Sequence, residues 1–245
     1  MSYVNTDFFM LFLTVSVFTV VQSVFGVGLL VFGTPTLLLL GYSFYETLTY
    51  LLPSSIVVSF FQVYYRWNYI SLYKGNVFYF LLPMVAFGLL IIVYISAVDL
   101  YLMIGIMLLF TSIARFSPSL SDLLGKLLSN NFRISLAFIG FIHGLTNLGG
   151  APLVAITNGI YNHKKEIQSN IAYAYLTMAV VQIIILVAIS EFAFDNIVLI
   201  LPFFSAIIYL SLGEHIFEST SQNIYENLMT FFIFVYGLLL ISNSF

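Results

Sequence analysis

The stretch GLTNLGGAP at residues 144–152 lies in the middle of a run, 134–162, that carries no charged side chain. As a helix, this run of about 29 residues would be roughly 44 Å long, whereas the hydrocarbon core of a bilayer is about 30 Å thick. Glycine and proline interrupt helices, and in lipid the freed backbone groups must face protein or a water-filled cavity. The stretch therefore predicts a helix that breaks inside a membrane.

A second stretch of this kind, GVGLLVFGTP at residues 26–35, interrupts the charge-free run 8–45. That run has about 38 residues, or roughly 57 Å as helix. We expect a short helix after each break, starting near Pro35 or Pro152, because proline is tolerated at the first helical position. Each short helix would have about 11 residues, roughly 16 Å, or half the membrane. We interpret each long run as a hairpin that turns back inside the bilayer.

The composition agrees with a membrane protein. Only 7% of the 245 residues are charged and 61% are hydrophobic, whereas a soluble domain usually carries about 25% charged residues. Six further charge-free runs of about 15 to 24 residues each suit one helical crossing. These runs are 47–65, 76–98, 100–114, 167–190, 196–213 and 227–245.

Several function classes find no support in the sequence. The absence of cysteine excludes disulfides and thiolate catalysis, and no basic patch predicts nucleic-acid binding. No HExxH, GxSxG or Walker stretch occurs, so we expect neither an enzyme nor a bound cofactor.

The basic residues indicate the topology. They are Arg66, Lys74, Arg115, Lys126, Arg133, Lys164 and Lys165. If both long runs turn back, all seven lie on one face of the membrane, whereas single crossings would split them five to two. Basic loops favour the cytoplasm. We therefore expect a multi-pass protein of the cell (inner or plasma) membrane with both termini outside the cytoplasm.

The two breaks divide the chain into similar halves. Residues 1–116 and 132–245 each contain a broken hairpin followed by three spans, and residues 117–131 form an amphipathic linker on the cytoplasmic surface. Because each half crosses an odd number of times, the second half enters from the opposite face. The predicted fold class is thus an all-α polytopic membrane protein with one membrane domain. It consists of two inverted repeats, each a Gly/Pro-broken helical hairpin followed by three transmembrane helices.

The broken segments resemble those of the sulfite exporter TauE/SafE family. The first repeat of that family carries GxGGGxxxxP, which Gly26, Gly28 and Pro35 match, although Leu29 and Leu30 replace two glycines. The second repeat carries Gly-Gly-x-Pro, matched at residues 149–152. A basic stretch then precedes a span, matched at 164–168, but the arginine that the family shows near 169–170 is absent.

The resemblance covers about residues 8–240. It implies a permease, often an exporter, of small sulfur-containing anions such as sulfite or organosulfonates.

The residues themselves also favour an anion. Short helices starting near Thr34 and Ala151 would direct free N–H groups and helix dipoles at the membrane centre. His143 and Asn147 share one helical face before the second break, and His143 is a candidate proton carrier. The candidate substrate-binding residues are Gly26, Gly28, Thr34, Pro35, Ser54, Ser55, His143, Thr146, Asn147, Gly149, Gly150, Pro152 and Asn170.

Other interpretations stay open at this point. Close helix packing explains glycines, and a buried histidine or serine often serves only to satisfy backbone groups. Gln62 and Gln182 are better explained as side chains that hydrogen-bond one helix to another than as residues that bind the substrate. The function expected is a secondary transporter of a small anion (sulfite, a sulfonate or a carboxylate), with a proton or cation as coupling ion and the lipid bilayer as its other partner. The alternatives are a passive anion channel and a membrane assembly protein that transports nothing.

Overall fold

The computed structural model describes residues 2–71, 73–94 and 100–221, together with residues 231, 234–235, 238–239 and 241–242. All regular secondary structure in these residues is helical, which confirms the predicted all-α class. The elements are α1 (Ser2–Phe25), α2 (Leu29–Leu39), α3 (Phe44–Tyr65), η1 (Trp67–Tyr69), α4 (Tyr73–Asn76), η2 (Val77–Leu81), α5 (Leu82–Tyr94), α6 (Leu100–Phe116), α7 (Pro118–Asn130), α8 (Phe132–Thr146), α9 (Gly150–Asn158), α10 (Lys164–Ala188), α11 (Asn196–Ile208), η3 (Tyr209–Gly213) and α12 (Glu214–Ser219).

Five helical stretches of the described residues are long and apolar enough to cross a membrane. They are Phe8–Phe25, Phe44–Tyr65, Tyr73–Tyr94, Lys164–Ala188 and Asn196–Ser219. Four shorter helices, α2, α6, α8 and α9, overlap the charge-free runs 8–45, 100–114 and 134–162. The run 227–245 lies mostly outside the described residues. The chain is therefore a multi-pass membrane protein.

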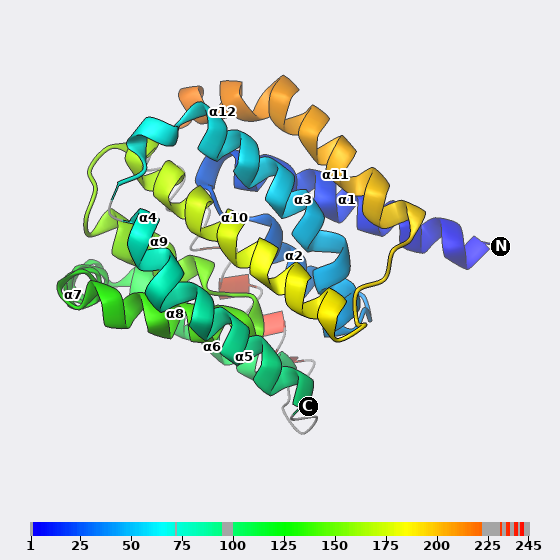
Figure 1. Ribbon diagram of the computed structural model, residues 1–245, viewed down its shortest axis with the longest axis horizontal. Helices are drawn as coiled ribbons and strands as arrows, with labels where there is room; N and C mark the ends of the chain where they lie inside the picture. Colours follow the sequence, from blue (N-terminus) through cyan, green and yellow to red (C-terminus); the bar gives the residue numbers. More distant parts are fainter. Residues whose placement is uncertain are drawn as a thin grey trace.

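Both long runs break and turn back. The helices α1 and α2 form one hairpin, and α8 and α9 form another, and the two hairpins enter from opposite ends of the helix bundle (Figure 1). Three helical stretches follow the first hairpin, namely α3, the α4–α5 segment and α6. The inverted-repeat relation, and the boundaries 1–116, 117–131 and 132–245, stay predictions.

The start of the first short helix differs from the prediction. We expected it near Pro35, but α2 begins at Leu29 and holds Pro35 in its interior. The break occurs at Gly26, whose φ of 72° lies in the left-handed region that favours glycine, and Gly28 caps α2. Gly33 therefore continues the helix instead of ending it. The short helix still has the expected length, with 11 residues. In the second hairpin, Pro152 is the third residue of α9, close to the predicted place.

The turn from α2 into α3 follows from its sequence. Gly41 has a φ of 92°, and the N–H of Tyr42 donates to the carbonyl of Leu37 at 3.0 Å, which ends α2 in a Schellman motif. Ser43 then caps α3 in a capping box with Glu46. A helix-stop signal followed directly by a helix-start signal thus connects α2 to α3 through four residues.

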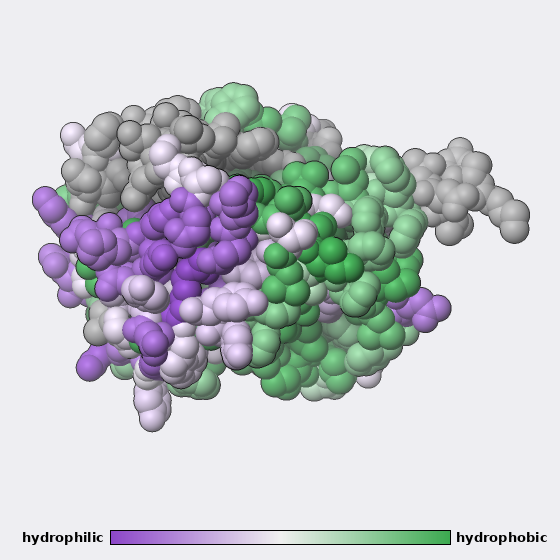
Figure 2. Space-filling model, turned by 90° about the horizontal axis from the view of Figure 1, so that it is seen from above, coloured by the Kyte–Doolittle hydropathy of each residue, from purple (hydrophilic) through white to green (hydrophobic). Residues whose placement is uncertain are grey.

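One end of the bundle collects the basic residues. It comprises residues 66–71 and 73–74, the end of α6, α7, the start of α8, the loop 159–163, the start of α10 and α12, and we call it the charged end. Tyr161 meets Ser71 there, with 2.7 Å between their hydroxyl oxygens, and Arg66 pairs with Glu214. Figure 2 shows hydrophilic residues gathered at this end and hydrophobic ones along the flank beside it. Tyr50 bonds Asp195 at the opposite end, where the turn after α2 and the loop after α10 meet.

Candidate substrate site

The second helix break is built around Asn147. This residue ends α8 with a φ of 63°, and its N–H donates to the carbonyl of His143 at 2.7 Å. Asparagine tolerates the left-handed conformation better than most residues. The hydroxyl of Thr146 accepts the N–H of Leu148 at 3.1 Å, so the residues of the break hold it in place themselves.

A chain of buried hydrogen bonds crosses this break. The N–H of Gly149 donates to Nδ1 of His143 at 3.3 Å, and Nε2 of His143 lies 3.2 Å from Oε1 of Gln182. Nε2 of Gln182 donates to Oδ1 of Asn147 at 3.4 Å, and Nδ2 of Asn147 donates to Oγ1 of Thr34 at 2.8 Å. Because Nδ1 of His143 accepts and Nε2 donates, the imidazole is the neutral tautomer. This hydrogen-bonding role is the one that the structure gives to His143.

The two short helices meet at their first turns. A Cβ on Gly150 would lie 2.5 Å from Cγ2 of Val31 and would overlap the hydroxyl of Tyr175. The adjoining bond from Asn147 to Thr34 joins the end of α8 to the middle of α2. Glycine at position 150 is therefore required for this close approach.

Both starts lie beside the middle of α10. Gly26 faces Ile171, and Gly150 faces Tyr175. These two α10 residues are four apart, or roughly 6 Å along the helix axis. The break before α2 and the start of α9 thus lie against the same helix, α10, about one turn apart.

The first helix break is built around Gln22, four residues before Gly26. Its Oε1 accepts the N–H of Leu29 at 3.2 Å, and its Nε2 donates to the hydroxyls of Ser55 and Ser59, both at 3.0 Å. His143 likewise stands four residues before Asn147. Each break therefore has a polar side chain one turn upstream that accepts an N–H at or beside the start of the next helix.

Two more glutamines complete the first break by capping the last carbonyls of α1. Nε2 of Gln62 donates to the carbonyls of Gln22 and Ser23, at 2.7 and 3.1 Å. Nε2 of Gln168 donates to the carbonyls of Ser23 and Val24, also at 2.7 and 3.1 Å. A helix that ends inside the membrane leaves such carbonyls without intrahelical partners, and here side-chain amides replace water.

Some buried polar atoms stay without a partner. Among the described residues, Oε1 of Gln62, Oε1 of Gln168 and Oγ of Ser54 are buried and form no hydrogen bond. Buried polar atoms of this kind cost about 1–3 kcal/mol each. The two amide oxygens, on α3 and α10, can each accept a hydrogen bond, and the Ser54 hydroxyl can donate one.

The structure brings most of the predicted residues together and separates one. The second break holds Thr34, His143, Thr146, Asn147, Gly149, Gly150 and Pro152, and Pro35 follows Thr34 in α2. The first break holds Gly26, Gly28 and Ser55, and Ser54 adjoins Ser55 in α3. Asn170 lies elsewhere, because its side chain bonds the backbone of Tyr69 and Ser71 at the charged end. It positions a loop there.

Sequence reasoning missed Gln22, Ser59 and Gln168. Each is a polar residue inside a charge-free run, and that is the signal that could have identified it. Gln22 stands one turn before a break, and Ser59 and Gln168 stand on spans that face the break.

Comparison with known families decides the classification. A family model described as Sulfite exporter TauE/SafE matches residues 11–240. The chain belongs to the TauE/SafE family. This TauE/SafE protein is thus a member of a family of membrane permeases, in agreement with its apolar spans. No curated protein and no solved structure matches the TauE/SafE chain.

Proposed function

We propose that this TauE/SafE protein is a secondary transporter, working as an exporter, of a small sulfur-containing oxyanion such as sulfite or a sulfonate. The observation that carries the proposal is the meeting of the first turns of α2 and α9 at Val31 and Gly150, beside Tyr175 of α10. Helix starts attract anions through their free N–H groups and the helix dipole. Two such starts at one place give an anion site without a basic residue.

The neutrality of the surrounding side chains suits transport. The polar groups at the two breaks are amides, hydroxyls and a neutral imidazole. A fixed Lys or Arg at this depth would bind an anion more tightly and would itself cost about 2.5–3.5 kcal/mol to insert. Neutral donors bind an anion weakly enough to release it on the other side.

The mechanism that we propose is alternating access between two inverted repeats. The bond from Asn147 to Thr34 joins the second hairpin to the first, and Val31 packs against Gly150 at the same place. If the hairpins rock against each other, the anion held between them is exposed first at the charged end and then at the opposite end. We place the charged end on the cytoplasmic side of the cell membrane because it carries the basic residues.

Counterflow in proteoliposomes tests the proposal. Vesicles loaded with unlabelled sulfite should take up labelled sulfite faster than empty vesicles, since a carrier exchanges substrate across the membrane. Vesicles are then loaded without a sulfite gradient and given a proton or sodium gradient. Net sulfite movement under these conditions supports a coupled carrier. Movement only down the sulfite gradient would establish the passive channel, and no sulfite movement at all would remove the proposed substrate.

A further inference from the structure

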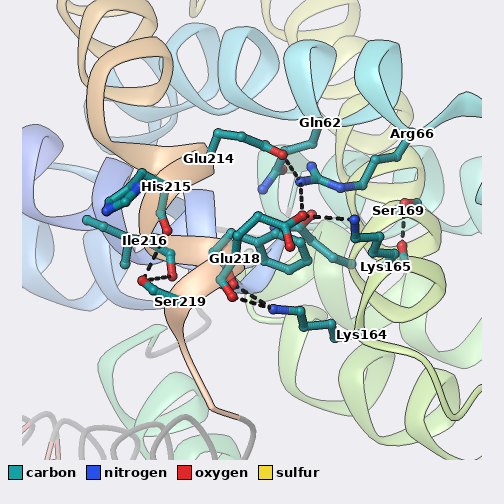
Figure 3. A network of polar contacts seen from close by, with 12 residues as sticks. Gln62, Arg66, Lys164, Lys165, Ser169, Glu214, His215, Ile216, Glu218 and Ser219 are labelled. Atoms are coloured by element: carbon teal, nitrogen blue, oxygen red, sulfur yellow. Dashed lines mark hydrogen bonds and ion pairs between the residues drawn. The ribbon is translucent and has the colours of Figure 1, made fainter.

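An ion-pair network joins three helix ends at the charged end. Arg66, which caps α3, pairs with Glu214 of α12, and its Nη2 lies 3.9 Å from Oε1 of Glu218 (Figure 3). Lys165, at the start of α10, pairs with Glu218 at 2.9 Å. The network thus holds the short helix α12 against α3 and α10.

Arg66 differs from its partners in burial. Its side chain is 4% exposed, whereas those of Glu214 and Glu218 are 44% and 46% exposed. The guanidinium carbon lies 4.3 Å from the centre of the Phe217 ring, which covers it. Arg66 is therefore a fixed, buried cation, and α12 supplies the carboxylates that neutralise it.

The guanidinium keeps unused hydrogen-bonding capacity. Nη2 makes both contacts to the carboxylates, while Nη1 is buried and has no hydrogen-bond partner within the described residues. Arginine presents a planar fork of donors that matches an oxyanion through two oxygens at once. One arm of this fork is open to a further acceptor.

A pocket that shares Phe217 with this network reaches toward the first break. Phe217, Lys164 and Gln168 line it together with Val24 and Phe25, the last residues of α1. The ammonium nitrogen of Lys164 lies 4.7 Å from the centre of the Phe217 ring. Phe217 thus has Arg66 and Lys164 both against its ring, and moving it would join the fork of Arg66 to the pocket.

The charges of the network leave room for an anion. The ion pairs match Arg66 and Lys165 with the two carboxylates of α12. Lys164 adds a third cation, which donates to the backbone carbonyls of Phe217 and Glu218 and takes part in no ion pair within the described residues. An anion that displaced Glu214 would replace one negative charge beside Arg66 with another. A glutamate carboxylate and a sulfonate are both oxyanions whose equivalent oxygens share one negative charge, so either can accept two N–H bonds from a guanidinium.

We propose that Arg66 is an anion-binding residue whose fork Glu214 occupies in this conformation. A small organic oxyanion, a sulfonate or a carboxylate, displaces Glu214 and enters the pocket beneath Phe217 on its way between the charged end and the first break. This inference rests on the proposed transport function and adds an outer binding site to it. Because the internal carboxylate competes with the ligand, removing it raises the fraction of protein ready to bind and tightens the apparent affinity.

The chain contains its own reporter for this site. Trp67 is the single tryptophan of the sequence and follows Arg66 directly, with the Lys74 ammonium nitrogen 4.2 Å from the centre of its ring. The full chain in detergent micelles is titrated with methanesulfonate while Trp67 fluorescence is recorded, and calorimetry on the same samples detects binding that leaves the fluorescence unchanged. Dimethyl sulfone, which is neutral and similar in size, serves as the control ligand.

Three variants make the test specific. Glu214→Gln should tighten the apparent Kd for methanesulfonate about tenfold, by freeing the fork. Arg66→Lys, which keeps the charge and loses the fork, should weaken binding about tenfold. Glu166→Gln should leave the Kd within about twofold, because its carboxylate takes part in no ion pair in the described part of the chain.

The outcomes separate this inference from the transport proposal. Unchanged or weaker methanesulfonate binding by Glu214→Gln, or no binding by either method, overturns the role of Arg66. If Arg66→Lys fails to give a monodisperse protein, the Glu214→Gln result decides alone. Wild-type sulfite counterflow together with an unchanged Glu214→Gln affinity removes only the outer site. Tightened binding without any counterflow removes only the transport function.

Discussion

Asn147 and Thr34 lie 113 residues apart in the sequence, and the side chain of Asn147 donates a hydrogen bond of 2.8 Å to the hydroxyl of Thr34. Both side chains are fully buried. The bond joins the break of the second hairpin to the short helix of the first. The two halves of the protein are thus connected at the place where we propose that the anion binds.

Replacing Thr34 with valine should impair transport without preventing insertion. Valine keeps the shape and removes the acceptor, which leaves Nδ2 of Asn147 buried and unpaired at a cost of about 1–3 kcal/mol. We expect sulfite counterflow to fall roughly tenfold. Thr36→Val is the matched control in the same helix, because the Thr36 hydroxyl bonds the carbonyl of Phe32, one turn back. Equal counterflow in both variants would argue against a role for the Asn147–Thr34 bond.

Replacing Gly150 with alanine should abolish sulfite counterflow. Local preference favours alanine in a helix by about 1 kcal/mol, but the new Cβ would overlap the Tyr175 hydroxyl. Overpacking of this kind typically costs about 1–3 kcal/mol. Removing that hydroxyl in the double variant Gly150→Ala/Tyr175→Phe should restore part of the flux. Gly75→Ala is the control, since a Cβ there meets nothing within 4 Å. Full activity in Gly150→Ala would show that the close approach is dispensable.

The two glutamines that cap α1 should show non-additive effects on stability. The carbonyl of Ser23 accepts from both Gln62 and Gln168, so either amide alone still satisfies it. We expect each single change to leucine to lower the free energy of unfolding by about 1–2 kcal/mol. The double change should cost about 1 kcal/mol more than the sum, because only then is the shared carbonyl unpaired. Denaturant unfolding in mild detergent measures the cycle, and simple additivity would contradict a shared cap.

The orientation of the charged end can be read by single-cysteine labelling, because the natural sequence has no cysteine to remove. A membrane-impermeant maleimide added to intact cells should label Glu191→Cys, in the loop that follows α10 at the end opposite the charged end. Lys126→Cys, on α7, should react only after the cells are opened. The reverse pattern would place the charged end outside and would overturn the cytoplasmic assignment.

Much of the fold follows from the charge-free runs and from the glycine and proline residues that interrupt helices. Runs with no Asp, Glu, Lys or Arg predict spans because charge is costly in lipid, and the two Gly/Pro stretches predict the breaks at Gly26–Gly28 and Asn147–Gly149. The start of α2 was missed because proline and glycine both stand near position 35. Proline alone does not start a helix. The feature that decides where α1 ends is the left-handed φ of Gly26, which residue type alone does not assign to one glycine among several.

The polar side chains around the breaks were predicted less well. His143 and Asn147 stand on one face of the helix next to a break, so local spacing identified them. Gln168 bonds Ser23 and Val24, which lie more than 140 residues earlier, and Asn170, two residues later, faces a different loop. Which face of α10 meets the break is set by packing between distant segments, and residue type alone does not reveal it.

The cap that Gln168 places on Ser23 bears on how the protein is made. Gln168, which donates to the carbonyls of Ser23 and Val24, follows Ser23 by 145 residues, so α1 and α2 are synthesised long before it. A nascent chain that carries only the first hairpin exposes these carbonyls in lipid, where each costs several kcal/mol. The end of α1 is therefore capped in two steps, at Gln22 and Ser23 once α3 is in place and at Val24 once α10 arrives. Biogenesis of this protein is in that sense completed from its second half.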